Sequence, residues 1–575
     1  MAGLTRSRAV RREARQLTPF APFAPPAPLA RFAPFTPFAR RPRRARLARL
    51  ATSCAGVVLL LGAAPLANAS EEGDDGADEV PADARTSAPA LDDLRRSYRV
   101  FAQDAARLTF TPPQIPDLSA YTTAAVKAKV DRSKAGSVVV APLLSEPGFN
   151  SLTTAVGQGL RELALRQKGG LRAILIEGGY VDLPQLTQSL PREIFEQAEP
   201  GVFIARLPIL VRHGATLHIG ANVKQLRLSQ ERGALLANEG TLFIVGSNVT
   251  GWHEQQSAAT RFKDQHEFRP FIIGWGGSRT YIADSTIAHL GYASTKAFGL
   301  SFSQYSNETV ERAVWPRPTG WVLNSKIEDL WYGFYCWEAD DVVLRGNTFK
   351  NNIKYGIDPH DRSQRLIIAE NDVFGTREKH GIIISREVNK SWIVNNRSHE
   401  NQLSGIVLDR QCRDTVIAHN VTFRNGSDGI VISESSHNLV WSNLAIGNQH
   451  HGIRLRNSGD VRIQDSSAIA NGLAGIYGVS RDLSGTDRDL KEDPYQKTLS
   501  MTVVGGQLSA NGSGPINVDE PSRIELLGID LRTPQRQLGY RLGGALLAFQ
   551  IDVLDILLRR KQVTVLEAQP ATAQR

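Results

Sequence analysis

A histidine flanked by carboxylates occurs in the segment Asp358-Pro359-His360-Asp361. Further along the chain come the pairs Ser385-Arg386 and Asp409-Arg410. A neutral imidazole accepts a proton near ambient pH, and a neighbouring carboxylate can fix its tautomer. A guanidinium can bind a carboxylate through two parallel hydrogen bonds. These residue types indicate a site where an acidic ligand loses a proton, provided that the fold brings the three segments together.

A repeat in the glycines shows which elements would position these segments. A glycine followed by an apolar residue recurs every 23 to 25 residues, at Gly333, Gly356, Gly381, Gly405, Gly429, Gly452 and Gly475. Two asparagine columns share the period, at Asn352, Asn401, Asn425, Asn448 and Asn471, and at Asn347, Asn371, Asn396, Asn420 and Asn443. A side-chain amide at the same turn of every coil can bond the backbone of the next coil. We therefore predict that these columns are structural ladders rather than ligands.

The segments between the repeated residues predict strands rather than helices. From about Gly136 onward, short apolar runs alternate with polar turns, which is typical of an all-β chain. The period is too short for a propeller blade, which needs roughly 40 residues or more. It favours a parallel β-helix, a solenoid whose coils stack at about 4.8 Å.

The repeat also predicts which way each side chain points, because strand residues alternate between two faces. The residues directly after the glycines are predicted to point inward: Phe334, Ile357, Ile382, Ile406, Ile430, Ile453 and Ile476. The outer face then gathers the charged residues of successive coils: Asp358, His360, Asp361, Ser385, Arg386, Asp409 and Arg410. His380, directly before Gly381, is a further candidate for this face. Such a strip would suit an extended anionic polymer.

A plain solvated charged face would show the same mixture of residues. Pro359 argues against that reading, because it interrupts the apolar inward column at a position where a strand barely tolerates proline. We therefore favour a functional groove.

The chain divides into four predicted parts. Residues 1–69 form an Arg- and Pro-rich leader, 70–135 an acidic linker and a small N-terminal cap, 136–534 the β-helix domain, and 535–575 a C-terminal capping helix and tail. The segment from Leu542 to Leu558 is apolar but carries Asp552 and Asp555. This pattern is typical of an amphipathic capping helix rather than a membrane span.

The net positive charge of the chain comes from the leader. Residues 1–69 contain twelve arginines, no lysine and one acid, Glu13, and so carry +11. Because the whole chain carries +9, residues 70–575 carry −2. The nearly neutral body removes the argument for a nucleic-acid partner.

The end of the leader is typical of a secretory signal peptide. An apolar run from about Ala55 to Leu66 follows the arginines and precedes Ala67-Asn68-Ala69. We predict a Sec-type signal peptide cleaved after Ala69. An uncleaved anchor is the alternative, although the run is shorter than the roughly 20 residues of a spanning helix. Only Cys336 and Cys412 would remain after cleavage, and we expect both to be buried free thiols.

Two segments carry a family resemblance: residues 355–363, which contain the Asp-Pro-His-Asp motif, and Lys379-His380-Gly381-Ile382-Ile383-Ile384-Ser385-Arg386-Glu387-Val388-Asn389. The chain here closely resembles the periplasmic mannuronan C-5-epimerases of alginate biosynthesis. Similarity continues through residues 404–410 and past Asn471-Gly472 to Val503-Val504-Gly505-Gly506. The resemblance implies a right-handed parallel β-helix in the periplasm that inverts C-5 of mannuronate residues in polymannuronate, giving guluronate. It also implies participation in an alginate secretion complex.

The resemblance assigns roles residue by residue. The family's catalytic base corresponds to His360, and the arginine that neutralises the substrate carboxylate corresponds to Arg386. Asp358 and Asp361 match the acids of the family motif and would orient the histidine or bind sugar hydroxyls. Removing the hydrogen on C-5 creates a dianion-like enediolate unless a cation lies against the sugar carboxylate, so the chemistry agrees with these roles.

Other groove residues complete the expected site. His380, Asp409 and Arg410 are candidate substrate-binding residues. Epimerisation also needs a proton donor on the opposite sugar face. The resemblance implies water, and Tyr335 or Tyr355 is the alternative, with Tyr355 also a candidate for binding substrate.

Three other functions share parts of this pattern. A uronate lyase uses the same base and neutralising cation but expels the 4-oxygen by β-elimination. A β-helix glycoside hydrolase would use paired acids such as Asp358 and Asp361, although Arg386 and His360 favour an acidic sugar and proton abstraction. A non-catalytic scaffold of a secretion complex would bind the polymer without turnover.

No metal or other cofactor is expected. The sequence contains no EF-hand loop, no nonapeptide calcium repeat and no His/Cys cluster with zinc spacing. Loss of activity in a chelator would overturn this expectation.

Overall fold

The structure is a computed structural model that describes residues 90–108, 111–142, 165–167, 170–294, 296–306, 311–491, 493–532 and 541–570. The predicted leader and its cleavage site after Ala69 lie outside the described residues. Within these described residues, three 15-stranded sheets, here named A, B and C, account for nearly all regular structure.

Sheet A opens each coil of the repeat region. Its strands, in chain order, are β1 (Tyr98–Gln103), β4 (Tyr180–Asp182), β8 (Thr216–Ile219), β11 (Thr241–Val245), β15 (Arg279–Ala283), β18 (Thr319–Leu323), β21 (Val343–Arg345), β24 (Ile367–Ala369), β27 (Trp392–Val394), β30 (Val416–Ala418), β33 (Leu439–Trp441), β36 (Val461–Gln464), β39 (Ser500–Val504), β42 (Arg523–Leu527) and β45 (Val563–Ala568).

Sheet C follows sheet A within each coil. Its strands are β5 (Phe195–Glu199), β6 (Val202–Ala205), β9 (Gln225–Ser229), β12 (Asn248–His253), β13 (Ala258–Ala259), β16 (Thr286–Ala288), β19 (Lys326–Glu328), β22 (Thr348–Lys350), β25 (Asp372–Phe374), β28 (Arg397–His399), β31 (Val421–Phe423), β34 (Leu444–Ile446), β37 (Ser467–Ile469), β40 (Gln507–Ser509) and β43 (Asp530–Arg532).

Sheet B closes the coil and contains the predicted site residues. Its strands are β2 (Ser137–Pro142), β3 (Arg172–Glu177), β7 (Ile209–Val211), β10 (Leu236–Asn238), β14 (Ile272–Trp275), β17 (Gly299–Ser303), β20 (Tyr332–Trp337), β23 (Tyr355–His360), β26 (Ile382–Ser385), β29 (Ile406–Asp409), β32 (Ile430–Ser433), β35 (Ile453–Arg456), β38 (Ile476–Val479), β41 (Ile516–Asp519) and β44 (Gly543–Gly544).

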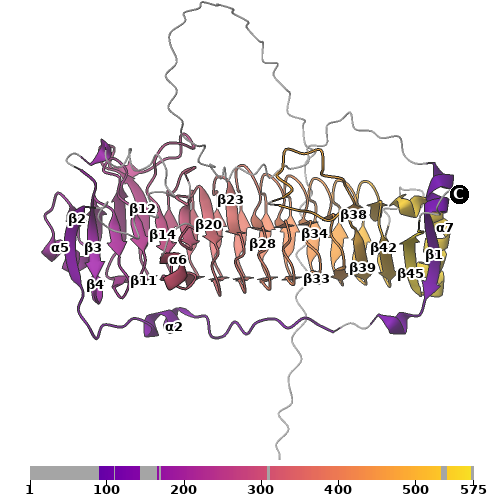
Figure 1. The fold of residues 1–575 in the computed structure, drawn as a ribbon, viewed down its shortest axis with the longest axis horizontal. Helices are drawn as coiled ribbons and strands as arrows, with labels where there is room; N and C mark the ends of the chain where they lie inside the picture. The colour runs from indigo at the N-terminus through magenta and orange to yellow at the C-terminus, as the bar shows by residue number, and fades with distance from the viewer. Residues whose placement is uncertain are drawn as a thin grey trace, which may run out of the picture. The chain divides into compact units, whose positions relative to one another are not determined.

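Equivalent strands of successive coils pair in parallel. In sheet B, for example, Ile382 of β26 pairs with Ile406 of β29, which pairs with Ile430 of β32. Figure 1 shows these strands stacked side by side from one coil to the next. The structure thus confirms the predicted all-β class and the parallel β-helix.

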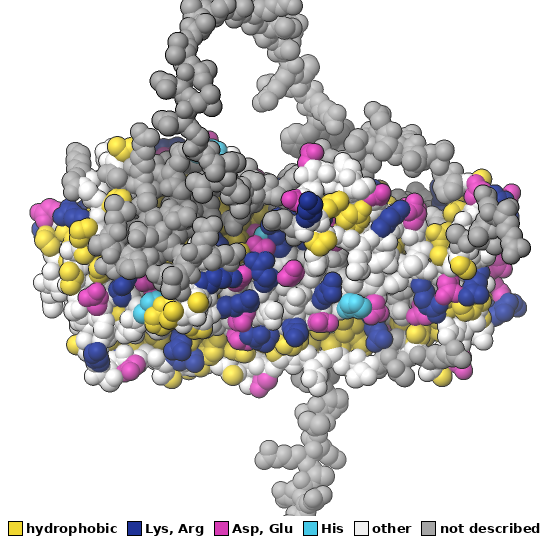
Figure 2. Space-filling model, in the orientation of Figure 1, with side chains coloured by type: hydrophobic (Ala, Val, Ile, Leu, Met, Phe, Trp, Pro, Cys, Tyr) yellow, Lys and Arg dark blue, Asp and Glu magenta, His cyan; other side chains and the backbone are white. Residues whose placement is uncertain are grey.

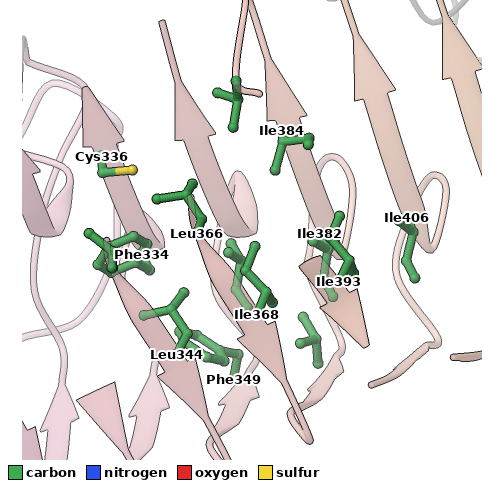
Figure 3. Close-up of a cluster of buried hydrophobic side chains, with 14 of the residues drawn as sticks. Phe334, Cys336, Leu344, Phe349, Leu366, Ile368, Ile382, Ile384, Ile393 and Ile406 are labelled. Atoms are coloured by element: carbon green, nitrogen blue, oxygen red, sulfur yellow. The ribbon is translucent and has the colours of Figure 1, made fainter. Parts of the chain in front are cut away.

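The interior of the coils is an apolar core. All seven residues predicted to point inward after the glycines are fully buried. Figure 3 shows part of the core, in which Phe334, Ile382 and Ile406 of sheet B face residues such as Leu344 and Ile368 of sheet A. Cys336 and Cys412 are buried free thiols, as predicted. Because side chains alternate along a strand, this core leaves the other face of sheet B for the site.

The two asparagine columns form hydrogen-bonded ladders at the turns, which confirms their predicted structural role. In one column Asn371 Nδ2 donates to Asn396 Oδ1 at 3.0 Å, and Asn396 Nδ2 donates to Asn420 Oδ1 at 3.0 Å. The other column repeats the pattern, with Asn425 Nδ2 donating to Asn448 Oδ1 at 2.9 Å. The ladders satisfy backbone groups at the bends, where the strands cannot pair.

Replacing one member of a ladder should destabilise the protein. Asn420 is fully buried; its Oδ1 accepts from the Asn396 backbone N–H at 2.9 Å, and its Nδ2 donates to the Ile393 carbonyl at 2.7 Å. Asn420→Ala leaves both groups buried without these partners, so the free energy of unfolding should fall by about 2–4 kcal/mol. Denaturant titration measures the loss. The exposed Arg397→Ala serves as control, with an expected change within about 0.5 kcal/mol; equal effects of the two substitutions would contradict the ladder's role.

The helical segments of the described residues are short, and several lie at the two ends of the solenoid. They include α1 (Leu91–Ser97), η1 (Ala105–Arg107), α2 (Thr123–Ala128), α5 (Leu183–Ser189), α6 (Glu311–Val314), η3 (Ala545–Phe549), α7 (Gln550–Leu554) and η4 (Asp555–Arg560). None of the helices in the described ranges has the length and apolar character needed to cross a membrane.

The C-terminal helical segment closes the last coil, as predicted. Leu546, Val553 and Leu557 of η3, α7 and η4 are buried within the main core. At the other end Leu183 and Leu186 of α5 enter the same core. Both ends of the apolar interior are thereby shielded from water, as a solenoid requires.

The segment before the first coil takes a longer path than the sequence indicated. β1 pairs antiparallel with β45 in the last coil, whereas β2 pairs antiparallel with β3 in the first. Between them, the Leu118 and Tyr121 carbonyls accept hydrogen bonds from Arg345 NH1, and Tyr121 packs edge-on against Trp321. β1 covers an edge of β45 that would otherwise present unpaired backbone groups. Figure 1 shows β1 beside β45.

Candidate active site

A groove on the outer face of sheet B brings most of the predicted site residues together. Its lining residues are Phe298, Tyr332, Tyr335, Lys354, Tyr355, Asp358, His360, Ile383, Ser385, Arg386, Asp409 and Arg410. They come chiefly from β20, β23, β26 and β29, which are consecutive in the sheet. Figure 2 shows that the visible face of the coils is rich in Lys and Arg side chains, with acidic ones between them.

Pro359 loosens the sheet at the site. β23 pairs with β20 along most of its length, but its pairing with β26 is limited to Ile357 with Ile382. The next pair of strands, β26 and β29, is regular over four residues. Proline has no N–H to donate, which accounts for the interrupted ladder. The interruption lies directly beside His360.

His360 lies at the end of β23, with Asp361 beside it. Its Nδ1 is 3.0 Å from Asp361 Oδ2, an electrostatic contact rather than a linear hydrogen bond. The same carboxylate oxygen accepts a hydrogen bond from Trp337 Nε1 at 2.9 Å. The carboxylate favours the tautomer with its proton on Nδ1, which leaves Nε2 as the proton acceptor.

The surroundings of His360 raise its pKa. Burial by itself disfavours the charged imidazolium, but the contact with Asp361 and the charges of Asp361 and Asp358 outweigh burial and the opposing charge of Arg386. Burial would also raise the pKa of Asp361, but the contact with His360 and the nearby cations lower it to about 2. Asp361 therefore stays ionised beside the histidine at neutral pH.

The two arginines in the groove differ in their contacts. Among the described residues, no carboxylate lies within 4 Å of the Arg386 guanidinium. Arg410, in contrast, lies 3.3 Å from Asp409 Oδ2 through its Nε and 3.2 Å from Asp493 Oδ2 through its NH1. Of the two arginines, Arg386 is therefore the better placed to receive a carboxylate from a ligand.

The groove strands β23, β26 and β29 each end in a bend with an unusual backbone conformation. Asp361, Arg386 and Arg410 follow their strands with φ of 30°, 56° and 56°. Non-glycine residues rarely adopt this left-handed region. Adjacent coils bond one another here, since the Arg362 N–H donates to the Arg386 carbonyl at 2.8 Å and the Arg386 N–H to the Asp409 carbonyl at 3.0 Å. The charged side chains consequently recur at one edge of the groove.

His380 lies outside the groove lining. It is buried behind Tyr355, with ring centroids 6.1 Å apart, and its Nδ1 accepts a hydrogen bond from the Ser404 backbone N–H at 3.1 Å. Burial lowers the pKa of His380 to about 3, so the ring is neutral. The geometry gives it a packing role beneath Tyr355.

Several lining residues were not predicted as site residues. Tyr332 shares the column of Tyr355, directly before the repeated glycine, so the period could have identified it. Phe298 and Lys354 lie at a strand entrance and in a turn, where no periodic signal exists. Among the described residues, no cluster of three or more His, Cys, Asp or Glu is arranged to hold a metal ion.

The contact between His360 and Asp361 predicts a pH effect. A general base acts in its neutral form, so activity should fall as the pH drops through the pKa of His360. Asp361→Asn removes the charge that raises this pKa, and the acidic limb of kcat/KM should move to lower pH. A pH series of kcat/KM on wild type and variant tests this expectation. An unchanged limb, or one that moves to higher pH, would contradict it.

The sheets and the groove define a right-handed parallel β-helix protein with a candidate active site on the outer face of one sheet. Residues 332–484 match the family described as right handed beta helix region. The chain is 51% identical over 487 residues to mannuronan C5-epimerase AlgG of Azotobacter vinelandii, covering 85% of this chain and 92% of the relative. It is 50% identical over 521 residues to the mannuronan C5-epimerase of Pseudomonas aeruginosa, covering 90% and 95%. The protein belongs to the mannuronan C5-epimerase family.

A solved structure supports the same assignment. The crystal structure of the periplasmic alginate epimerase AlgG is similar with a TM-score of 0.72 and 45% sequence identity. The match covers 74% of this chain and all of that structure. The similarity therefore extends over the β-helix that positions the groove.

Proposed function

We propose that this protein converts mannuronate to guluronate residues within polymannuronate, the mannuronate homopolymer that becomes mixed alginate, by inverting C-5. The observation that carries the proposal is the pairing, in one groove, of an oriented histidine with an arginine that has no carboxylate partner among the described residues. Membership of the mannuronan C5-epimerase family supports the choice of substrate.

Arg386 has the first task, because the hydrogen on C-5 is adjacent to a carboxylate. Its removal places a second negative charge on that group. A guanidinium that binds both carboxylate oxygens stabilises this charge more strongly in the transition state than in the ground state. The guanidinium of Arg386 is available for this contact, whereas that of Arg410 already contacts Asp409 and Asp493.

His360 has the second task, removal of the proton. With the Nδ1 proton favoured by Asp361, Nε2 accepts the C-5 hydrogen and becomes an imidazolium that the same carboxylate stabilises. Reprotonation on the opposite face then gives guluronate. Water supplies this proton in our proposal, and Tyr335 or Tyr355 of the groove lining is the alternative donor. Asp358, Asp409 and Arg410 contact the sugars on either side.

We also propose the compartment in which the reaction takes place and the partners of the protein. The similar solved structure is described as periplasmic, and a signal peptide cleaved after Ala69 would deliver residues 70–575 to that compartment. Partners in an alginate secretion complex would receive the modified polymer. Both proposals concern the chain outside the groove and can be tested independently of the chemistry.

Proton NMR of polymannuronate incubated with residues 70–575 in deuterated water tests the activity. Guluronate signals should grow while deuterium enters at C-5, because the new proton comes from a donor that exchanges with solvent. Unsaturated chain ends would instead identify a lyase, since β-elimination uses the same base and cation. An unchanged polymer would favour a scaffold that binds without turnover.

A further inference from the structure

Trp337 lies next to His360 in the sheet, although it is not part of the groove lining. It ends β20, pairs with His360 of β23 and is nearly buried. Its indole Nε1 donates to Asp361 Oδ2 at 2.9 Å, and that oxygen is 3.0 Å from His360 Nδ1. One carboxylate oxygen thus joins the indole to the imidazole.

Two cations lie against the indole ring. Lys296 Nζ is 3.4 Å from the ring centroid, and Arg312 Cζ is 5.4 Å from it. Arg312 is itself held by an ion pair with Glu338 and by a hydrogen bond of 2.9 Å to the Tyr305 carbonyl. A cation over an aromatic face draws electron density from the ring, which makes the indole N–H a stronger donor.

The geometry of the contact between Asp361 and His360 explains why Asp361 needs a further partner. Asp361 is the next residue in the chain, so its carboxylate reaches Nδ1 at an angle too bent for a linear hydrogen bond. Asp361 also has φ of 30°, outside the favoured regions for non-glycine residues. A carboxylate on a strained backbone needs a second contact to keep one orientation, and the Trp337 N–H supplies it.

The other groups that face His360 do not substitute for this contact. Asp358 precedes it on β23, Arg386 follows in the next coil, and the Tyr335 ring centroid lies 6.0 Å away on β20. Lys354 lines the groove from a turn. Among the described residues, no hydrogen bond to Asp361 Oδ2 other than that from Trp337 is found.

We propose that Trp337 is a positioning residue for the catalytic histidine, acting through Asp361 to fix the tautomer and orientation of His360. The inference rests on the proposed role of His360 as base. Trp337 thereby joins the pair of Asp361 and His360: Trp337 contacts Asp361, and Asp361 contacts His360. The indole withdraws charge from Asp361 and so limits how strongly that carboxylate retains the imidazolium.

Trp337→Phe keeps an aromatic side chain, although a smaller one, and removes the hydrogen-bond donor. We expect kcat on polymannuronate to fall roughly 10- to 100-fold with KM little changed, because the base is misplaced while the groove is intact. The acidic limb of kcat/KM should move to higher pH, since Asp361 without its donor holds the proton of His360 more tightly. This shift is opposite to that expected for Asp361→Asn. The double variant should follow Asp361→Asn alone, because Trp337 acts through Asp361.

A second readout does not depend on turnover. Diethyl pyrocarbonate modifies neutral imidazole, and mass spectrometry of the peptide that contains His360 follows its reaction against pH. The profile should move to higher pH in Trp337→Phe even if the substrate assignment is wrong. Trp321→Phe, the same change at a tryptophan on sheet A, should leave the profile and kcat unaltered.

Three outcomes would overturn the proposal. They are an unshifted His360 profile in Trp337→Phe, a shift that persists in the Asp361→Asn background, and an equal effect of Trp321→Phe. Trp337→His, whose ring N–H can still donate to Asp361, covers the case of a poorly folded phenylalanine variant. It should recover part of kcat, and no recovery in a folded Trp337→His protein would count against the proposal.

Discussion

His360→Gln is expected to lower kcat on polymannuronate by about 10²- to 10⁴-fold. Glutamine is close in size to histidine but cannot take up a proton at neutral pH. The substitution therefore removes the base. It leaves the buried core unchanged, because the core residue of this strand is Ile357. Proton NMR in deuterated water measures both guluronate formation and deuterium at C-5. The two signals should disappear together, because they depend on the same abstraction step.

His437→Gln provides the matched control for this substitution. Its side chain is 56% exposed, lies in a turn outside the groove lining and contacts Asp460. Activity of this variant should equal that of wild type. If His360→Gln kept more than about one tenth of the wild-type kcat, proton abstraction would have to be assigned to another group.

Arg386→Lys is expected to lower kcat by about 10²- to 10³-fold, with a smaller effect on KM. Lysine retains the positive charge but replaces a planar fork with a single ammonium group. Ground-state attraction of the polyanion is largely kept, whereas two-point stabilisation of the enediolate is lost. Arg386→Gln, which removes the charge as well, should be more severe.

Separate measurement of kcat and KM tests this assignment. Arg424→Lys serves as control, because Arg424 is 58% exposed and its one ion pair within the described residues is with the exposed Glu400. If Arg386→Lys raised KM and left kcat unchanged, Arg386 would bind the polymer without stabilising the reaction. The role of neutralising cation would then pass to Arg410, whose contacts with Asp409 and Asp493 a substrate carboxylate would have to displace.

Much of the site could be predicted from the sequence because the fold repeats. In a stacked solenoid each coil contacts mainly its neighbours, so residues one period apart become neighbours in space. The column after the repeated glycines gave the buried face, from Phe334 to Ile476. Strand alternation then placed Asp358, His360 and Ser385 on the opposite face, and all three line the groove.

The asparagine columns were predictable for the same reason. A polar side chain that recurs at a bend has a defined set of backbone groups to satisfy, one coil away. The bonds from Asn371 through Asn396 to Asn420 follow directly from the spacing.

The period alone did not predict which residues of a column line the groove. His380 and Tyr355 stand at equivalent positions before successive glycines, yet Tyr355 lines the groove while His380 packs behind it. The difference depends on rotamers and on the Ser404 N–H that His380 accepts. Neither is encoded in the spacing of residues along the chain.

The class of fold, the buried face and the row of charged residues follow from the amino-acid sequence, because they depend on local periodicity. The contact of Asp493 with Arg410, which distinguishes the two groove arginines, follows from the folded structure, since Asp493 reaches Arg410 from a non-repeating loop. The folded structure also decided the approach of Lys296 and Arg312 to Trp337 and the pairing of β1 with β45. These contacts join segments with no common period, so their geometry is set by packing of the whole chain rather than by any spacing within it.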